Sequence, residues 1–394
     1  MRRAARRRGG APARPAAVPL ALLLLLADPR QSARAEDFLA YKYVDYAEAG
    51  GRIGVRTQVL DASQGIDADT QLGLVLTNDA IAGASPTGLP APAGSGQVPL
   101  AHLSDHRKEW EADLARQVQS VNIDLGVSES REHDYVSRGW SLNTLSDFND
   151  RNTTLIAGAG GHDDDAETFF TAARPYAPRH AFSAVLGGKQ LLDPFTFVTV
   201  SATWGRETGY LDDQYKLVQK TLELAPGSFF PTPFAENLPD THDFVALLAS
   251  VNRSFPGARA ALEASLRWYR DTYGVSAGTL EAGWLQKLGG RLTLEPSLRL
   301  HEQGAASFYH YDLDATDIMP TQVPDPAGPN YSSDYRLSSL WTATYGLKLA
   351  CKLTDRLQAD LAYDRYAMHG RDGVTPGSAY PSANIVSAGA RFSW

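Results

Sequence analysis

The chain ends in the segment Ile385-Val386-Ser387-Ala388-Gly389-Ala390-Arg391-Phe392-Ser393-Trp394. Every second residue from Val386 to Trp394 is apolar, and the residues between them are mostly polar. This period of two is typical of a β-strand that separates an apolar from a polar environment. A last strand of this kind, closed by an aromatic residue, predicts a Gram-negative outer-membrane barrel. Phe392 and Trp394 then form the signal that the barrel-insertion machinery reads.

The other end of the chain has the composition of a secretory signal peptide. Basic residues such as Arg6 and Arg7 precede an apolar run at 18–27, and Ala33-Arg34-Ala35 matches an A-x-A cleavage site. The apolar run is shorter than the roughly 20 residues that a transmembrane helix needs. We therefore expect residues 1–35 to be removed and residues 36–394 to form one barrel domain in the outer membrane.

Removal of residues 1–35 would also change the charge of the protein. These residues hold eight Arg and one Asp, so the formal net charge would move from −8 to −15. Such an acidic chain is disfavoured as a nucleic-acid binder. The partners that we expect are outer-membrane lipid, lipopolysaccharide, the barrel-insertion machinery and a small solute, and no cofactor is expected.

Period-two segments fill the rest of the chain. In the stretch 262–268, for example, the even positions are apolar and Glu263 and Arg267 lie between them. Charges are too frequent on the second face for the dry core of a soluble sandwich, and they fit the wet lumen of a membrane barrel. The charged residues predicted to face the lumen are Arg52, Arg56, Asp124, Glu263, Arg267, Glu295, Arg299, Lys348, Asp360 and Arg391. They either pair across neighbouring strands and stiffen the wall, or set a transverse field in a pore.

The pattern predicts an all-β fold, a transmembrane antiparallel β-barrel of about sixteen strands. The expected strands are 38–48, 52–61, 68–78, 106–116, 119–129, 133–146, 151–161, 180–190, 195–206, 241–252, 258–271, 274–287, 291–304, 334–350, 355–367 and 384–394. Every second connection is short, and the opposite set contains all the long ones: 79–105, 162–179, 207–240, 305–333 and 368–383. Short periplasmic turns and long extracellular loops are a property of outer-membrane barrels. Pro296 interrupts one strand, and we expect a bulge there.

Several stretches resemble one family. They are Ala80–Gly88 (AIAGASPTG), Leu103–Arg107 (LSDHR), Phe148–Leu155 (FNDRNTTL), Thr208–Lys216 (TGYLDDQYK), Trp268–Asp271 (WYRD) and Tyr331–Leu337 (YSSDYRL). Together they are similar to the domain-of-unknown-function 3570 family of outer-membrane barrels, over nearly the whole chain after the signal peptide. The resemblance implies the barrel fold and the outer membrane, and it implies no activity.

Two clusters offer weaker chemical possibilities. Asp163, Asp164 and Asp165, on an expected loop, could hold Ca²⁺, although their spacing does not match an EF-hand and a solvated acidic loop explains them too. His133 and Asp134 could form half of a hydrolase site, but adjacent residues on a strand point to opposite faces. We therefore expect no enzyme and no catalytic residue.

The function that the sequence favours is a porin-like channel or facilitator for a small solute, because porins with sixteen strands leave an aqueous channel. The alternative is a surface-interaction or structural barrel with a plugged lumen and working outer loops. A barrel hydrolase is the weaker alternative. The long loops 162–179, 207–240 and 305–333 carry 14 acidic residues against 4 basic ones, which predicts a preference for cations if the pore conducts.

Overall fold

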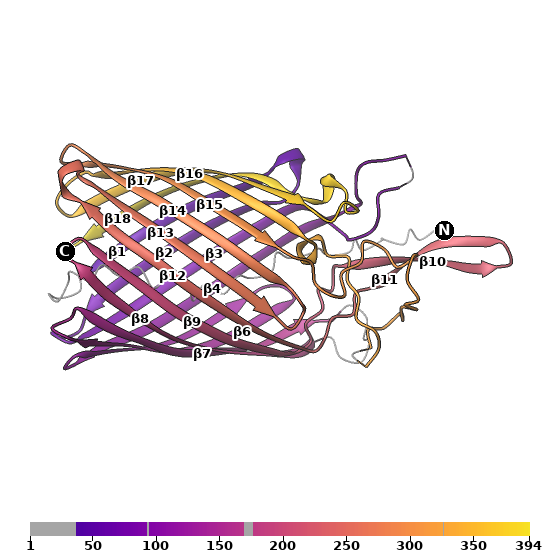
Figure 1. The fold of residues 1–394 in the computed structure, drawn as a ribbon, viewed down its shortest axis with the longest axis horizontal. Helices are drawn as coiled ribbons and strands as arrows, with labels where there is room; N and C mark the ends of the chain where they lie inside the picture. Colours follow the sequence, from indigo (N-terminus) through magenta and orange to yellow (C-terminus); the bar gives the residue numbers. More distant parts are fainter. Residues whose placement is uncertain (1–36, 93, 169–175, 326) are drawn as a thin grey trace, which may run out of the picture.

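The computed structural model describes residues 37–92, 94–168, 176–325 and 327–394, so the expected signal peptide at 1–35 lies outside the described residues. Sixteen antiparallel strands close into a barrel, drawn in Figure 1. They are β1 (Phe38–Glu48), β2 (Gly54–Gly65), β3 (Thr70–Pro86), β4 (Leu100–Val118), β5 (Val121–Arg131), β6 (Tyr135–Phe148), β7 (Thr153–Glu167), β8 (Tyr176–Asp193), β9 (Thr196–Gly209), β12 (Thr241–Phe255), β13 (Ala260–Asp271), β14 (Ser276–Leu288), β15 (Leu292–Gln303), β16 (Leu340–Lys352), β17 (Leu357–Gly370) and β18 (Ser382–Ser393). The predicted fold class is confirmed. No helix within the described residues is long and apolar enough to cross a membrane.

The barrel closes where its last strand pairs with its first. Leu39 of β1 lies opposite Phe392 of β18, and the backbone N–H of Trp394 donates to the carbonyl of Asp37 at 3.1 Å. Both ends of the described chain therefore lie at one end of the barrel, at the left of Figure 1. Since β18 also pairs with β17, every strand of the barrel has two neighbours and no edge is left free.

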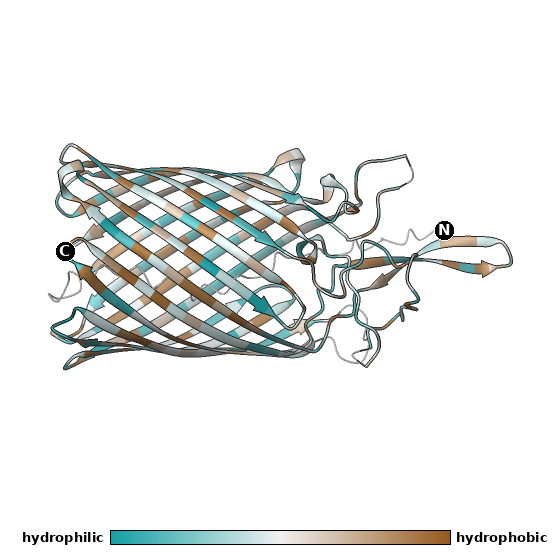
Figure 2. Ribbon diagram, in the orientation of Figure 1, coloured by the Kyte–Doolittle hydropathy of each residue, from teal (hydrophilic) through white to brown (hydrophobic). Residues whose placement is uncertain are grey.

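Hydrophilic and hydrophobic residues alternate along many strands of the wall (Figure 2), and successive side chains of a strand point to opposite faces. The outer face carries large apolar residues that the rest of the described chain leaves exposed, such as Leu125 (52% exposed), Leu186 (61%) and Leu266 (62%). Exposed apolar surface on this scale is rare on proteins surrounded by water. The outer wall therefore has the chemistry of a surface that hydrocarbon solvates.

The two ends of the barrel differ in their connections. At the turn end, where the described termini lie, the connections are the short segments 66–69, 119–120, 149–152, 194–195, 256–259, 289–291 and 353–356. Gly289 adopts a positive φ of 71° in one of them, a conformation that favours glycine. The opposite loop end carries the longer segments 87–99, 210–240, 304–339 and 371–381. The predicted separation of short and long connections is thus present.

The structure corrects three details of the sequence-based prediction. The loop at 207–240 contains a hairpin of its own, β10 (Leu217–Ala225) paired with β11 (Ser228–Ala235), which projects beyond the loop end in Figure 1. Residues 162–167 belong to strand β7 and not to a loop, because the strands extend past the apolar band. Pro296 causes no bulge, since the pairing between β14 and β15 resumes in the same register on both sides of it.

Candidate functional site

The predicted lumen residues lie mostly on the inner face of the barrel. The eight that do so are Asp124, Glu263, Arg267, Glu295, Arg299, Lys348, Asp360 and Arg391, each one position away from outward apolar residues. Three of them form ion pairs across neighbouring strands: Arg299 Nε lies 2.7 Å from Glu281 Oε1, and Lys348 Nζ lies 3.4 Å from Glu295 Oε2. Arg391 lies over the ring of Phe38, 3.7 Å from its centroid.

The prediction that Arg56 faces the lumen is wrong, and Arg52 lies outside the barrel strands. Arg56 lies on the outer face with Leu60 and forms an ion pair of 3.6 Å with Asp45 of the neighbouring strand. The alternation that places Leu60 toward lipid places Arg56 on the same side, because the two are four residues apart. Arg52 lies before β2, where it pairs with Glu48 at 3.0 Å and donates to the carbonyls of Ser378 and Ala379. It therefore ties the wall to a loop at the loop end.

Carboxylates concentrate on one side of the lumen. Asp61 of β2, Glu111 and Asp113 of β4 and Asp124 of β5 share this side, and we call these four residues the acidic wall. Among the described residues none of the four forms an ion pair. On the opposite side, β13 to β16 carry cations and carboxylates in similar numbers, several of them paired. The lumen is therefore electrostatically uneven across its width.

The long segments of the loop end fold into a cap, defined as the described residues of 87–99, 210–240, 304–339 and 371–381. The described residues form three buried hydrophobic clusters, and all three lie in the cap or where it joins the strands. One cluster, for example, packs Val218 and Phe234 of the hairpin against Leu313 and Tyr331. The cap therefore has a packed core, whereas the barrel beneath it has a polar interior.

The cap crosses the mouth of the barrel. Its segments 87–99, 210–240 and 304–339 leave the wall at three well-separated places, next to β3, β9 and β15. They nevertheless touch, because the N–H of Leu217 donates to the carbonyl of Thr87 at 2.8 Å and Ser333 Oγ donates to the carbonyls of both Gly88 and Leu217. Segments that start on separate parts of a ring and meet in this way must span the opening.

A buried ionic cluster holds the cap together. Arg336 forms ion pairs with Asp334 and, at 2.7 Å, with Asp213. Lys216, which is only 1% exposed, donates to the carbonyl of Pro86 at 2.8 Å. Burial alone would raise the pKa of Asp334, but the charges of Arg336 and Lys216 outweigh this and lower that pKa to about 2.

Two more carboxyl groups of the cap lie in a different electrostatic environment. Burial raises the pKa of Glu236 well above its usual range, and the nearby charge of Asp213 raises it further. Glu236 accepts hydrogen bonds from Ser332 Oγ and from the backbone N–H of Asp213, each at 2.6 Å. Burial raises the pKa of Asp212 to about 7. The cap therefore combines a carboxylate held charged by its cations, Asp334, with one carboxyl group, Asp212, that titrates near neutral pH.

Sequence reasoning missed Lys216, Glu236, Asp334 and Arg336 as a site, although a signal was present. Lys216 ends the stretch Thr208–Lys216, and Asp334 and Arg336 belong to Tyr331–Leu337, two of the stretches that carry the family resemblance. A third stretch, Ala80–Gly88, supplies the carbonyls of Pro86 and Gly88. The stretches that looked like separate motifs therefore meet in one place.

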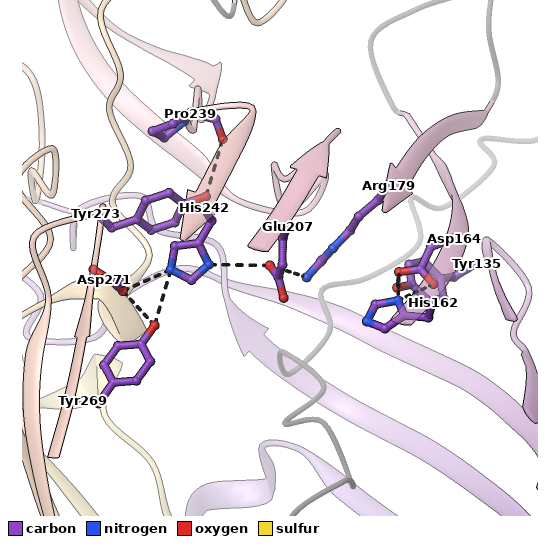
Figure 3. A network of polar contacts seen from close by, with 10 residues as sticks. All are labelled: Tyr135, His162, Asp164, Arg179, Glu207, Pro239, His242, Tyr269, Asp271 and Tyr273. Atoms are coloured by element: carbon purple, nitrogen blue, oxygen red, sulfur yellow. Dashed lines mark hydrogen bonds and ion pairs between the residues drawn. The ribbon is translucent and has the colours of Figure 1, made fainter. Parts of the chain in front are cut away.

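A second polar network lies on the inner face of the wall at the loop end (Figure 3). His242 is at its centre, with Nε2 3.1 Å from Asp271 and Nδ1 3.6 Å from Glu207. Arg179 donates to Glu207 at 2.8 Å, and the hydroxyl of Tyr269 donates to Asp271 at 2.9 Å. These contacts connect β8, β9, β12 and β13 in a row, so they stiffen the rim to which the cap attaches.

The three aspartates proposed for Ca²⁺ do not converge. Asp163 and Asp165 lie on the outer face of β7, and Asp164 lies on the inner face, since neighbours in a strand point to opposite sides. Asp163 contacts His180 at 2.5 Å, whereas Asp164 contacts His162 and Tyr135. A different group, Asp105, Glu132 and Asp134, brings its carboxylate oxygens within 4.8 Å of one another.

His133 and Asp134, the residues considered for a hydrolase site, differ in their exposure to solvent. His133 is exposed, whereas Asp134 is 4% exposed. Asp134 accepts hydrogen bonds from Gln214, at 2.8 Å, and from the hydroxyl of Tyr215. Its visible role is therefore to hold the cap segment 210–240 against the connection between β5 and β6.

Phe392 and Trp394, the predicted insertion signal, lie on the outer face at the turn end. They are 45% and 52% exposed, and their rings stack with centroids 5.9 Å apart. Phe392 belongs to β18, the strand that closes the barrel against β1, and Trp394 follows the end of that strand directly. This position leaves their rings accessible on the outside of the closing strand.

Comparison with known families gives a match over most of the chain. The model of the family described as "Protein of unknown function (DUF3570)" matches residues 16–177 and 167–384. The chain belongs to this family. The predicted membership is confirmed, and all the motif stretches quoted above fall within the matched residues. None of the curated proteins matches the chain.

Solved structures with a similar fold are outer-membrane proteins of very different sequence. A bacterial polysaccharide outer membrane secretin is 10% identical, with a TM-score of 0.47, over 91% of this chain and 98% of its own. The CymD monoaromatic hydrocarbon channel is 10% identical, with a TM-score of 0.41, over 91% and 88%. The ferric enterobactin receptor PfeA from Pseudomonas aeruginosa is 11% identical, with a TM-score of 0.42, over 91% of this chain. The chain spans 60% of that receptor's length, and no function follows from similarities this low.

Proposed function

We propose that this protein is an outer-membrane channel for small hydrophilic solutes, with its loop end outside the cell and its cap acting as a sieve across the mouth. A closed barrel with an apolar outer wall is one of the few structures that satisfy all backbone hydrogen bonds in a bilayer. Barrels of sixteen strands are wide enough to leave an aqueous channel. Long loops at the end opposite both described termini fit the extracellular side.

One observation carries the channel proposal. Charged side chains on the inner face remain exposed: Arg299 is 44%, Glu281 53% and Lys348 43% exposed. Because these side chains point inward, their exposure reflects open space inside the barrel. Charged groups in such a space require water, since a dry lumen would impose a large desolvation cost. A wet lumen beneath a cap that spans its mouth favours selective passage of solutes.

The test is single-channel recording of refolded residues 36–394 in planar bilayers. We expect discrete conductance steps, and Asp334→Asn should increase their size because it breaks the buried ion pair that holds the cap. Asp163→Asn, which removes a carboxylate from the outer face, serves as the matched control and should leave the steps unchanged. Absence of conductance in wild type and in Asp334→Asn would overturn the proposal.

The second candidate is a surface-interaction barrel, and the β10–β11 hairpin favours it. The hairpin projects beyond the rest of the cap (Figure 1), and its distal part exposes Leu224 (66%), Phe229 (63%) and Phe230 (50%). Large apolar residues at a projecting tip are typical of contact surfaces. Under this candidate the lumen would stay closed and neither the wild type nor Asp334→Asn would conduct.

A further inference from the structure

The β10–β11 hairpin joins the rest of the cap through a connection that two carboxyl groups hold closed. Asp212 Oδ1, before the hairpin, accepts a hydrogen bond at 2.6 Å from the backbone N–H of Leu238, after the hairpin. Glu236 Oε1 accepts in the opposite direction from the backbone N–H of Asp213, also at 2.6 Å. We call Asp212, Asp213, Glu236 and Leu238 the neck. The attachment of the hairpin therefore depends on the state of two carboxyl groups.

The neck rests on the rim of the barrel. Leu238 packs against a buried cluster that contains Tyr273 and Val275, which lie in the connection between β13 and β14. The hydroxyl of Tyr273 also donates to the carbonyl of Pro239, next to the neck, at 3.5 Å (Figure 3). An opening of the neck would therefore loosen both the hairpin and its attachment to the wall.

The neck belongs to a group of charged residues that cannot all be ionised at once and remain electrically balanced. Two cations, Lys216 and Arg336, share this region with the carboxyl groups of Asp212, Asp213, Glu236 and Asp334. Glu236 and Lys216 are each 1% exposed and Asp334 is 5% exposed, so water screens an excess charge poorly. Balance therefore requires that at least two of the four carboxyl groups carry a proton.

The contacts indicate which two carboxyl groups hold these protons. Asp213 and Asp334 both contact the guanidinium of Arg336, so each has a cation beside it. Within the ranges that the structure describes, Asp212 and Glu236 form no ion pair. Burial raises the pKa of both carboxyl groups, that of Asp212 to about 7. Glu236 is almost fully buried and Asp212 only partly, so Asp212 gives up its proton first as the pH rises.

Loss of the Asp212 proton places a negative charge among groups that do not neutralise it. The titratable groups that face Asp212 come from its own segment, from the segment after β11, from the connection between β13 and β14 and from 304–339: Tyr210, Asp213, Glu236, Tyr273 and Tyr331. None of these five groups can be positively charged. A carboxylate in such surroundings is stabilised by contact with water, so ionisation favours an opened neck.

We propose that the neck is a proton-operated latch of the cap, which is closed while Asp212 is protonated and opens when this proton passes to water. The cap then holds the hairpin firmly in acid and releases it at neutral pH. The inference rests on the proposed channel function in one respect, since an opened neck is expected to widen the path for solutes.

The direction of the pH dependence follows from the two states of the latch. The Asp212 side chain has a pKa of about 7 in the closed neck and of about 3.9 when it is free in water. The preference for the closed neck is therefore complete below about pH 3.9 and is lost progressively up to about pH 7. Because the two pKa values differ by about 3, the ratio of closed to open neck falls by up to about a thousandfold.

The experiment measures distances between two spin labels on refolded residues 36–394, with Cys351→Ser to remove the native thiol. Labels at Ala225→Cys, on the hairpin, and Ser276→Cys, on β14 at the loop end, report where the hairpin lies relative to the wall. We expect a narrow distance distribution at pH 4 and a broad one at pH 8. Asp212→Asn cannot ionise, so it should keep the narrow distribution at both pH values. Asp240→Asn removes an exposed carboxylate of the same segment outside the neck, and this matched control should respond as the wild type does.

Single-channel recording of the same variants connects the latch with passage of solutes. Under the proposed function, the wild type should conduct more at pH 8 than at pH 4, and Asp212→Asn should remove most of this difference. A pH response of the distances without conductance at either pH would support the latch and refute the channel. Failure of the latch and failure of the channel are therefore distinguishable.

Three outcomes would overturn the latch. The first is a wild-type distance distribution that is the same at pH 4 and pH 8, or narrower at pH 8. The second is a response that persists in Asp212→Asn, since another group would then carry the titration. The third is a response that disappears equally in Asp240→Asn, which would indicate a general effect of charge. Should Asp212→Asn lose the heat-modifiable band that marks a folded barrel, Asp212→Leu, which cannot ionise either, replaces it.

Discussion

The wall and the cap of this protein are stabilised in opposite ways. In the wall, neighbouring strands pair in register, large apolar side chains point outward and charged side chains point inward. In the cap, apolar residues such as Val218 and Leu313 are fully buried, and segments distant in sequence meet through a buried ionic cluster. The wall therefore depends on repeated local pairing and on the surrounding bilayer, whereas the cap depends on a few specific long-range contacts. Single substitutions should consequently have large effects in the cap and graded effects in the wall.

The largest expected effect comes from the place where the wall itself must close. Deletion of residues 392–394 removes the last pairing of β18 with β1 and both rings of the predicted insertion signal. We expect stable insertion to be lost, because an open sheet edge cannot persist in hydrocarbon. The measurement is the heat-modifiable band of outer-membrane fractions. Deletion of residues 224–230 at the exposed hairpin tip, which leaves the packed Val218 and Phe234 in place, is the control and should leave the band unchanged. A normal band in the 392–394 deletion would contradict the expectation.

The second effect tests the cap. Asp334→Asn leaves Arg336 with one fewer carboxylate in a buried cluster, and breaking such a pair costs about 3–5 kcal/mol. We expect the cap to loosen while the barrel stays intact, so protease should cleave within 210–240 although the heat-modifiable band remains. Loss of both together would show that cap and wall fold as one cooperative unit. Protection equal to that of the wild type would show that the cluster is not what holds the cap.

The same contrast explains what could be predicted from sequence. Each of the sixteen predicted segments corresponds to a strand of the barrel, because alternation is a local signal that survives without knowledge of the neighbours. Arg56 shows the limit of that signal. It is charged, yet it lies on the outer face at the same two-residue spacing as its apolar neighbours, so its charge alone predicted the wrong face. The cap was not predictable in this way. Lys216 and Asp334 are far apart in the chain, and only the closed ring of strands brings them together.

Two adjacent residues of β13 test which face of the wall contacts lipid. Leu266→Arg places a charge on the lipid face, which costs about 2–4 kcal/mol near the middle of the bilayer. Arg267→Leu removes a charge from the inner face and should cost much less. Urea unfolding of the two variants in micelles or vesicles measures the difference. Equal midpoints would mean that the outer surface is not solvated by hydrocarbon at this height.

A smaller effect concerns the pH dependence of the cap. Burial raises the pKa of Asp212 to about 7 from an unfolded value of about 3.9. The folded cap therefore holds this proton more tightly, so the contribution to stability is complete below about pH 3.9 and is lost as the pH rises through about 7. Protease protection of 210–240 should fall progressively between about pH 4 and about pH 7, by roughly the amount that one titrating group allows. In Asp212→Asn this step should disappear, and a step that persists would assign the titration to another group.

The smallest expected effect is the ion preference of the lumen, which tests whether the inner wall acts on passing solutes at all. The sequence predicted that acidic residues of the outer loops cause the cation preference. The acidic wall of Asp61, Glu111, Asp113 and Asp124, however, lines the lumen itself and forms no ion pair with the described residues. We expect a modest cation preference in reversal-potential measurements at low salt, which fades near 1 M salt, where the Debye length is about 3 Å. Replacing Glu111 and Asp113 by Gln and Asn should reduce the preference, whereas Glu129→Gln on the outer face should not. Anion preference at low salt would show that the cations of β13 to β16 control the lumen. An unchanged preference in the Glu111 and Asp113 variant would show that the acidic loops of the cap set the ion preference. Selectivity would then belong to the cap, which long-range contacts hold together, and not to the wall.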